Sequence, residues 1–321
     1  MEWAEAPFGP LFPGLPGGLA LTLTLDGDTV ARAKATSGAV HRGLAATWAG
    51  PTTGFPDRLA LLDPQTPVAY RVLASRALED AAAFTINDAV ARHRVGALER
   101  ERALSHLGWL ADFAALLGDR WLAERAVRLQ FALLRATDDP GASRVGREIA
   151  AFVRRAQRLP LLKQRLNGIG HDASHAAETV QGPFARACGM TVDARRNDPA
   201  YRALGFAPVV HDGNDAWARL RVRLDELTQS MNLIRAVGTT VLPTPPALIA
   251  GSGAGTATVE TPRGPAMLHL VLHDGQVETV HLDTPSARLV DLVPGMAEGR
   301  ELADALVGIA SLDLSPWEVD R

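Results

Sequence analysis

The first hydrophobic pattern of the chain is an alternation near its N-terminus. Four leucines alternate with alanine and threonine over positions 19–25, which is the period of a half-buried strand. Asp26-Gly27 follows, and residues 29–35 form a second run of the same kind. Asp-Gly between two such runs predicts a β-hairpin, placed after a Pro/Gly-rich stretch at positions 7–18.

A helical period replaces this alternation from about residue 67 to residue 237. The clearest helix begins near Asn214, because its apolar residues recur at steps of three and four. Such a spacing gives one apolar seam that packs against neighbouring helices. The residues of the seam are Trp217, Leu220, Leu224, Leu227, Met231 and Ile234.

The C-terminal part returns to a strand pattern after a Pro/Gly-rich stretch at 243–255, which we interpret as a linker. Leucines alternate over 268–272, Asp274-Gly275 predicts a turn, and 277–282 predicts the returning strand. A short helix is expected at about 298–310. The order of strands, helices and strands predicts an α+β fold, with an N-terminal β region at 1–50, a helical bundle at 51–240 and a C-terminal region at 241–321.

Composition narrows the possible chemistry. The 321 residues are 47% hydrophobic and carry a net charge of −3, so the chain builds a core and offers no basic footprint for nucleic acid. Cys188 is its one cysteine, which excludes disulfides within the chain and metal sites built on paired thiolates. No apolar run approaches 18 residues and no signal-peptide pattern is present, so we expect neither a transmembrane helix nor a secretory signal.

Two local motifs have a functional and a plain interpretation. His171 and His175 are four positions apart, a spacing that binds zinc on a helix, but the preceding glycines favour a polar loop that caps the next helix. Residues 251–256 are glycine-rich like a phosphate-binding loop, but they lack its Lys-Ser/Thr and follow no predicted strand. We interpret them as a flexible linker.

Six segments then follow the motifs of one family, in the same order along the chain. Residues 99–107 correspond to E-L-x-R-x-x-S-H-L, and residues 260–264 correspond to E-x-P-R-G. The other four segments are 37–43, 182–195, 215–230 and 311–321. Together they resemble the large subunits of energy-converting nickel–iron hydrogenases and the homologous D-type, quinone-site subunit of respiratory complex I. The most similar type is a cysteine-less, hydrogenase-related large subunit.

The resemblance implies a nickel–iron hydrogenase large-subunit-like fold, with an N-terminal sheet, a central helical bundle, and C-terminal strands whose tail returns to the bundle. In the hydrogenases, four thiolates hold the metals. The corresponding positions here are Ala60, Asp63, Ser315 and Glu318, so every sulfur ligand is lost. A hard-metal site built on Asp63, Ser315 and Glu318 is the alternative, but the complex I tail pattern already accounts for Glu318. We therefore expect no metal.

The resemblance also implies a place for a quinone headgroup, held in complex I by a histidine and a tyrosine. The two histidine positions of the family loop are Phe12 and Pro16, and the motif D-R-x-D-Y carries Ala60 and Leu61 at its last two positions. None of these side chains donates or accepts a proton. Tyr70 lies nearby in the sequence, and it either substitutes for the lost tyrosine or belongs to the core. Quinone binding therefore stays open.

These implications lead to one functional expectation. The chain occupies the large-subunit position of a complex I-like or hydrogenase-related assembly, holds no cofactor itself, and transmits coupling between a redox partner and the membrane. The implied partners are a small subunit with a 4Fe-4S cluster, another peripheral-arm subunit and membrane-arm subunits, at the cytoplasmic face of the cell membrane. NAD is associated with the family's assembly and not with this chain. The residues expected at the old site and at the subunit interface are Arg58, Glu99, Arg102, Ser105, His106, Glu260, Arg263 and Asp320.

Two alternatives remain at this point. In one, the chain is an active oxidoreductase whose acceptor is bound in a rearranged pocket by Arg58, Asp63 and His41, with His106 and Arg263 as further catalytic candidates. In the other, it is an assembly protein without a redox partner.

Overall fold

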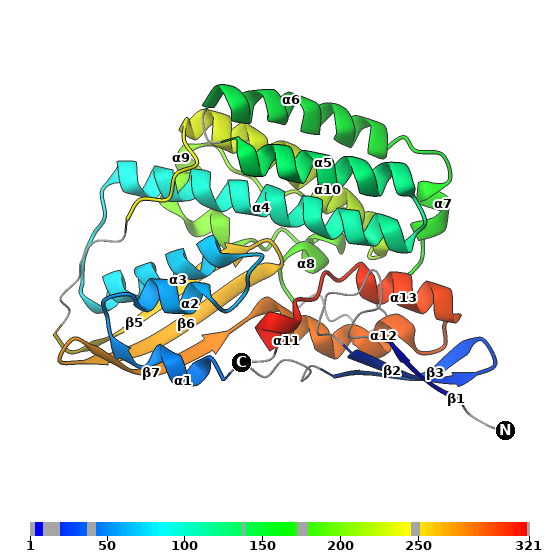
Figure 1. The fold of residues 1–321 in the computed structure, drawn as a ribbon, viewed down its shortest axis with the longest axis horizontal. Helices are drawn as coiled ribbons and strands as arrows, with labels where there is room; N and C mark the ends of the chain where they lie inside the picture. The colour runs from blue at the N-terminus through cyan, green and yellow to red at the C-terminus, as the bar shows by residue number, and fades with distance from the viewer. Residues whose placement is uncertain are drawn as a thin grey trace.

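The computed structural model describes residues 4–8, 20–36, 43–136, 139–171, 179–244 and 251–319. Long helices form an upper layer in Figure 1, and an antiparallel sheet forms the lower layer, with α3 (Pro67–Ala81) between them. A second, smaller sheet lies beside the first, next to the C-terminal helices. The α+β class and the order of its regions are thus confirmed.

Four helices make up the bundle, namely α4 (Asp88–Leu116), α5 (Arg120–Arg135), α6 (Asp139–Ala156) and α10 (Ala216–Val237). Side-chain caps fix where two of them begin: Asn87 and Asp215 each accept a backbone N–H from the first turn of the helix that follows. The predicted seam of α10 is confirmed, because five of its six residues are buried in one core with α4, α5 and α6 and Trp217 packs against that core.

The larger sheet has the strand order β4-β7-β6-β5, and all neighbouring strands are antiparallel. Its strands are β4 (Gly50–Pro51), β5 (Gly253–Thr261), β6 (Gly264–His273) and β7 (Gln276–Asp283). Helix α3 packs on β5 and β6, while α1 (Ala45–Trp48) and α2 (Phe55–Ala60) complete this half of the molecule. The alternating leucines of β6 point into the core beneath α3.

The linker expected at 243–255 is wrong at its C-terminal end. Strand β5 begins at Gly253, so the glycine-rich residues 253–256 belong to the sheet. A Cβ added to Gly255 would lie 2.0 Å from the carbonyl oxygen of Ala77 on α3. Glycine is therefore present because helix and strand approach closely, and not because the segment is flexible.

The smaller sheet contains β1 (Ala4–Phe8), β2 (Ala20–Asp26) and β3 (Thr29–Thr36), and the predicted hairpin joins β2 to β3. It packs on α12 (Val293–Ala297) and α13 (Leu302–Ala310), which follow α11 (Pro285–Leu289) and η3 (Val290–Leu292). The helix expected at 298–310 therefore begins four residues later. Gly299, with a φ of 74°, separates it from α12.

Short elements connect the layers: α7 (Leu162–Leu166), α8 (Pro183–Ala187), η2 (Ala194–Asn197), α9 (Pro199–Ala203) and α14 (Pro316–Val319). The C-terminal tail returns to the bundle as expected, since Trp109 donates to the carbonyl of Ala310 (2.9 Å) and Arg223 to that of Leu312 (3.2 Å). Among the described helices, none is long and apolar enough to cross a membrane.

Candidate functional site

Charged side chains meet in the interior between the bundle and the larger sheet. On α4, Glu99, Arg102 and His106 are three and four positions apart and therefore share a face. The facing side of α10 carries a matching series at the same kind of spacing. Its members are Arg219, Arg223, Glu226 and Ser230, and all four are buried.

Glu226 is the centre of the first group of ion pairs. Its Oε1 lies 2.9 Å from Nη2 of Arg186 and 2.7 Å from Nη2 of Arg195, and its Oε2 lies 2.8 Å from Nε2 of His106. Burial opposes ionisation, but the two guanidinium groups hold the pKa of Glu226 well below its usual value. Burial also lowers the pKa of His106, so a neutral imidazole donates its Nε2–H to the carboxylate.

Glu99 forms a second centre beside Glu226. It accepts from the hydroxyls of Tyr201 (2.7 Å) and Ser230 (2.6 Å), and Arg195 lies 3.2 Å away. Although burial alone would raise the pKa of Glu99, Arg102 and Arg195 lower it. We call these connected residues the Glu226 cluster: Glu99, Arg102, His106, Arg186, Asp193, Arg195, Glu226 and Glu260.

Arg263, in the turn between β5 and β6, is the centre of a separate group. Its Nη1 lies 2.8 Å from Oδ2 of Asp63 and 3.9 Å from Oε1 of Glu318, and its Nε lies 3.4 Å from Oδ1 of Asp313. A glycine contact fixes this turn, because a Cβ on Gly182 would lie 2.5 Å from the carbonyl oxygen of Arg263. The segments 182–195 and 260–264 therefore meet through backbone.

The tail closes this group. Glu318 of α14 accepts from the Tyr70 hydroxyl (2.8 Å), from the Ser286 backbone N–H (3.0 Å) and from the Ser286 hydroxyl. Burial, followed by the Glu318 charge, raises the pKa of Tyr70 well above its usual value. Burial likewise raises the pKa of Glu318, since Arg263 only partly offsets it. We call this the Arg263 cluster: Asp63, Tyr70, Arg263, Ser286, Asp313 and Glu318.

Two of the four positions that the resemblance aligns with the hydrogenases' thiolates thus meet at one guanidinium. Asp63 and Glu318 both approach Arg263, while Ala60 is a buried methyl group in α2 and Ser315 is buried in the tail. Within the described residues, no group of three or more histidine, cysteine, aspartate or glutamate side chains is arranged to hold a metal ion. Cys188 ends α8, and its thiol lies 3.1 Å from Oδ1 of Asn214.

Arg58 and Asp63 have different partners. The Arg58 guanidinium donates to the carbonyls of Pro51 (2.7 Å) and Thr53 (3.3 Å), whereas Asp63 pairs with Arg263. The alternative pocket of Arg58, Asp63 and His41 stays a prediction, because His41 lies outside the described residues. Leu61 is 61% exposed. Several predicted positions lie outside the described residues: Phe12, Pro16, His41, Asp320 and the segment 172–178 with His175.

The motif residues expected at a subunit interface are instead buried within this chain. Arg102 donates to the backbone carbonyls of Glu260 (2.6 Å) and Thr261 (3.0 Å), and Glu99 and His106 are enclosed by this chain's own elements. Ser105 is also buried, but it lines a cavity beside α4. If these residues contribute to a subunit interface, they do so indirectly, through the residues that cover them. Their role at an interface stays a prediction. Residues around the clusters that were not proposed as site candidates are Arg186, Asp193, Arg195, Tyr201, Glu226 and Asp313.

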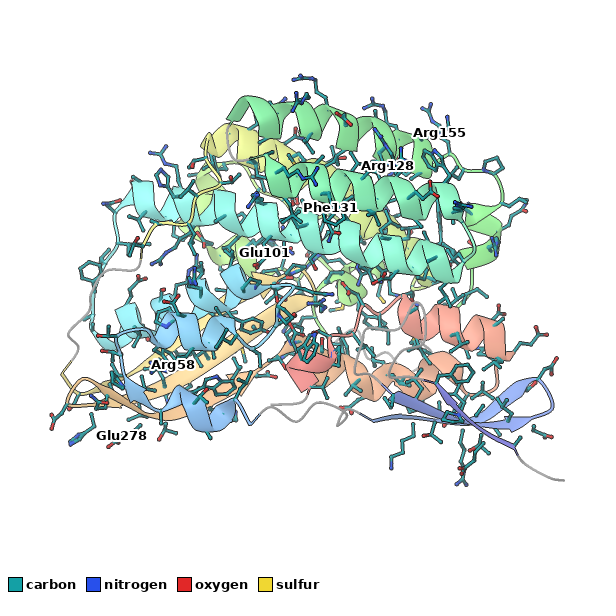
Figure 2. The ribbon with its side chains drawn as sticks, viewed as in Figure 1. Arg58, Glu101, Arg128, Phe131, Arg155 and Glu278 are labelled. Atoms are coloured by element: carbon teal, nitrogen blue, oxygen red, sulfur yellow. The ribbon has the colours of Figure 1, made fainter. Side chains whose placement is uncertain are left out.

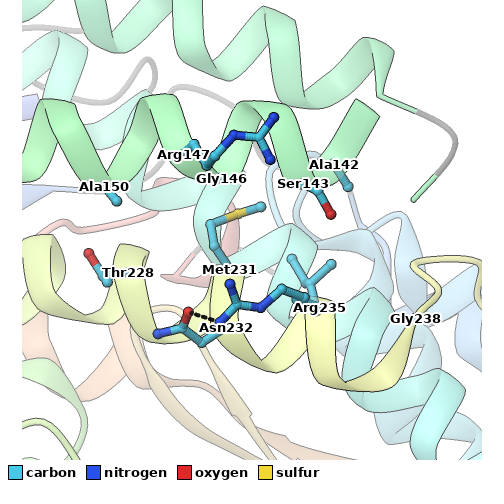
Figure 3. A pocket seen from close by; sticks show the side chains of 11 residues that line it. Ala142, Ser143, Gly146, Arg147, Ala150, Thr228, Met231, Asn232, Arg235 and Gly238 are labelled. Atoms are coloured by element: carbon cyan, nitrogen blue, oxygen red, sulfur yellow. Dashed lines mark hydrogen bonds between the residues drawn. The ribbon is translucent and has the colours of Figure 1, made fainter. Parts of the chain in front are cut away.

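A hollow of about 310 Å³ lies apart from both clusters, between α6 and α10 (Figure 3). Arg147 and Arg235 line it, and Arg235 donates to Oδ1 of Asn232 at 3.1 Å. Gly146 allows α6 to approach Met231 there. None of the predicted site residues lines this hollow.

Comparison with known proteins agrees with this architecture. The D subunit of the NADH-quinone oxidoreductase of Desulfotalea psychrophila is 28% identical, over 98% of this chain and 95% of the relative. The corresponding protein of a Nocardioides species is 28% identical, over 98% and 90%. A chain in the solved structure of a membrane-bound sulfane sulfur reductase, an archaeal respiratory membrane complex, shares the fold with a TM-score of 0.81 at 24% identity, covering 99% of this chain and 98% of that one.

The family model of the respiratory-chain NADH dehydrogenase 49 kDa subunit matches residues 142–252 and 247–321. These ranges include most of α6, all of α10, the larger sheet apart from β4, and the tail. They also include α8, η2 and α11, and most residues of both clusters therefore lie within the matched ranges. The chain therefore belongs to the family of the respiratory-chain NADH dehydrogenase 49 kDa subunit.

Proposed function

We propose that this chain is the large-subunit component of a complex I-like, membrane-associated respiratory assembly, and that it holds no redox centre of its own. The Arg263 cluster is the observation that supports the absence of a redox centre in this chain. In it, Arg263 pairs with Asp63 and Glu318, two of the four residues that the resemblance aligns with the metal-binding thiolates of the hydrogenases. The names of the relatives, which are subunits of NADH-quinone oxidoreductases, support the first part.

The residues at these positions do not fit a nickel–iron centre. Such a centre needs soft thiolates, whereas the positions carry a methyl group, a hydroxyl and two carboxylates. Both carboxylates are already in the field of Arg263, so a metal cation there would lie beside a buried positive charge. Cys188 lies on another element and makes its own contact with Asn214.

The residues also fit poorly to a quinone headgroup held by a tyrosine. Leu61 carries no polar group, and Tyr70 is fully buried with its hydroxyl hydrogen-bonded to Glu318. Tyr70 would have to break this bond to reach a ligand. The structure therefore favours the core interpretation of Tyr70 over its use as a substitute donor.

We infer that the two clusters couple distant parts of the chain. They join α4, α10, the β5–β6 turn and the tail through ion pairs between residues far apart in sequence, such as Asp63 and Glu318 around Arg263. Removing one partner of a buried pair is costly. A shift of the tail would therefore also move or break its ion pairs with the β5–β6 turn. This coupling supports a role in transmitting conformational change between a redox partner and the membrane.

The expected partners are an iron–sulfur small subunit, another peripheral-arm subunit and membrane-arm subunits, with the chain peripheral at the cytoplasmic face. The test is affinity purification of the tagged full chain, in mild detergent, from the cells that produce it. We expect an iron–sulfur protein and integral membrane proteins to purify with it in fixed ratio. Isolation of the chain alone, with no such proteins at any detergent or salt condition, would overturn the proposal.

A further inference from the structure

Helix α5 has two apolar stripes, and only one of them is covered by this chain. Leu122, Ala126, Leu129 and Leu133 are buried in the bundle core. A second stripe, Val127, Phe131 and Leu134, is 37%, 51% and 47% exposed. Its spacing of four and three places all three side chains on one outward face over two turns. Figure 2 shows Phe131 on this face, with Arg128 beside it.

The exposed stripe leads into a cavity of about 600 Å³ between α4, α5 and the start of α3. Leu134 belongs to both, and Val241, which is 65% exposed, lies at the rim. Most of the lining is apolar. It includes Pro64, Pro67, Val68, Ala97, Leu104 and Leu242. An exposed apolar stripe and an apolar cavity therefore form one continuous surface.

Two polar atoms among the residues that line this cavity have no hydrogen-bond partner, the Ser105 hydroxyl and Nε of Arg100. The Arg100 guanidinium still donates through Nη2 to the carbonyls of Leu133 and Leu134, so the Ser105 hydroxyl is the side chain left unpaired, whereas its neighbours are engaged. Glu101 accepts from the backbone N–H groups of Val68 (2.5 Å) and Ala69 (2.8 Å), and Gln130 donates to the carbonyl of Leu104 (3.1 Å). A buried hydroxyl without a partner is costly, so an incoming group with a polar tip would gain a hydrogen bond there.

Helix α5 is basic. It carries four arginines and one acidic residue, Glu124, in a chain whose net charge is −3. Arg128 and Arg135 are exposed beside the stripe, and Arg128 lies 4.0 Å from Glu124. An approaching surface gains from negative charge at its edge. Aromatic side chains and arginine are also the residue types enriched at protein interfaces.

We propose that Val127, Phe131, Leu134, Val241 and Ser105 form a docking face for an amphipathic helix of another subunit, acidic along its flank, which inserts an aromatic side chain with a polar tip into the cavity. The proposal rests on the proposed function, because it names a surface by which the chain meets its assembly. A small molecule would fill the cavity and leave Phe131 exposed, whereas a helix covers both. Spacings of i, i+4 and i+7 are those by which helices dock.

The test uses the tagged full chain with a photo-crosslinking benzoylphenylalanine at position 131, expressed in the cells that produce it. We expect one major crosslink, to a helical segment of another subunit of the purified assembly. The matched control carries the same group at Phe84, which is 45% exposed on the turn after α3, and should not give that product. Crosslinking only to a second copy of this chain, only to lipid, or to no protein would overturn the proposal.

A second measurement uses charge and shape. We expect two variants to retain the crosslinked subunit about tenfold or more weakly on washing with salt. One is Phe131→Asp, and the other combines R128E with R135E. Phe84→Asp, and R154E with R155E on α6, are the matched controls and should retain it. Thermal melting of each variant shows whether the chain is folded. If every variant retains all subunits, the docking proposal is wrong and the proposed function stands; if even the unaltered chain purifies alone, the proposed function itself is wrong.

Discussion

The two clusters are both buried and both combine arginines with carboxylates, but their charges are arranged in opposite ways. In the Glu226 cluster one carboxylate lies within 3 Å of two guanidinium groups. In the Arg263 cluster one guanidinium is shared by three carboxylates, at 2.8, 3.4 and 3.9 Å. The pKa of Glu226 is accordingly lowered, while that of Glu318 is raised.

The difference shows that burial alone does not set the charge state of a carboxyl group. Glu226 and Glu318 are both completely buried. Burial raises the pKa of each carboxyl group and nearby arginines lower it, so the number of arginines determines the direction of the net shift. Arg223 lies between the clusters, 3.7 Å from Oδ2 of Asp313. The Glu226 cluster is therefore held together by many cations, and the Arg263 cluster by essentially one.

Removing that one cation should give the largest effect. Arg263→Met leaves Asp63, Asp313 and Glu318 buried without their main partner, so we expect the free energy of unfolding to fall by about 3–5 kcal/mol. Chemical denaturation measures this, and expression yield reports it if the variant does not fold. Arg263→Lys retains the charge and should recover part of the loss. Equal loss in both variants would contradict the charge argument.

Glu226→Gln should be the next most damaging change. The amide keeps the shape and one acceptor but leaves Arg186 and Arg195 without their shared charge, at a cost of about 2–3 kcal/mol. The loss should be smaller than for Arg263→Met, because Asp193 remains bonded to both arginines. A larger loss than for Arg263→Met would reverse the comparison.

The pH dependence of stability should differ in sign between Glu226 and Glu318. The folded pKa of Glu226 lies below the usual 4.5, so its contribution is present above that pH and is lost as the pH falls through the folded pKa. The folded pKa of Glu318 lies above 4.5, so its contribution is fully present below that pH and is lost as the pH rises.

Denaturation across about pH 2–8 tests this contrast. From about pH 4.5 upward, Glu318→Gln should narrow its stability gap to the unaltered chain. The gap for Glu226→Gln should narrow only in the acid range below about 4.5. Parallel profiles of unfolding free energy against pH for the two variants would show that Glu226 and Glu318 do not differ in charge state.

Tyr70→Phe should have a smaller effect. It removes the hydroxyl that donates to Glu318 and costs about 1 kcal/mol, since the Ser286 hydrogen bonds to Glu318 remain. Thermal unfolding detects the change. If this variant were instead fully stable but lost a quinone-dependent activity of the assembly, Tyr70 would be the substitute donor.

The smallest effect is expected outside both clusters. Arg125 and Glu148 form an ion pair between α5 and α6 at 3.2 Å, with side chains 37% and 46% exposed. Arg125→Ala should change stability by less than about 0.5 kcal/mol, because water screens such a pair. A loss of unfolding free energy as large as that of Glu226→Gln would mean that solvent exposure does not predict how much an ion pair stabilises this chain.

The sequence predicted those parts of the fold that depend on local periodicity. The seam of α10 and both Asp-Gly turns are confirmed, because apolar spacing and turn residues act over a few positions. Strand β5 was missed, since its glycines reflect the approach of α3, which is distant in sequence. Likewise the start of α13 depends on Gly299 and on packing against the smaller sheet.

The site was predictable as motifs but not as contacts. The resemblance selected Glu99, Arg102, His106 and Arg263, and the structure places all four in the clusters. Nothing local indicates that Glu318 meets Tyr70, 248 positions away, or that Asp63 pairs with Arg263. Tertiary packing determines such contacts. The sequence does not show that Arg186 and Arg195 pair with Glu226, because the pairing requires α8 and α10 to be adjacent in the fold.

Arg263 pairs with Asp63 and Glu318, which correspond to two of the four positions at which the hydrogenases hold their metals, and we propose that no metal binds there. The most direct measurement is the metal content of this subunit after mild separation from its partners, by mass spectrometry of the intact chain and elemental analysis. The account predicts a chain at its sequence mass without stoichiometric nickel, with the iron of the assembly remaining on another subunit. One nickel retained per chain, and lost in the Asp63→Ala or Glu318→Ala variant, would contradict it.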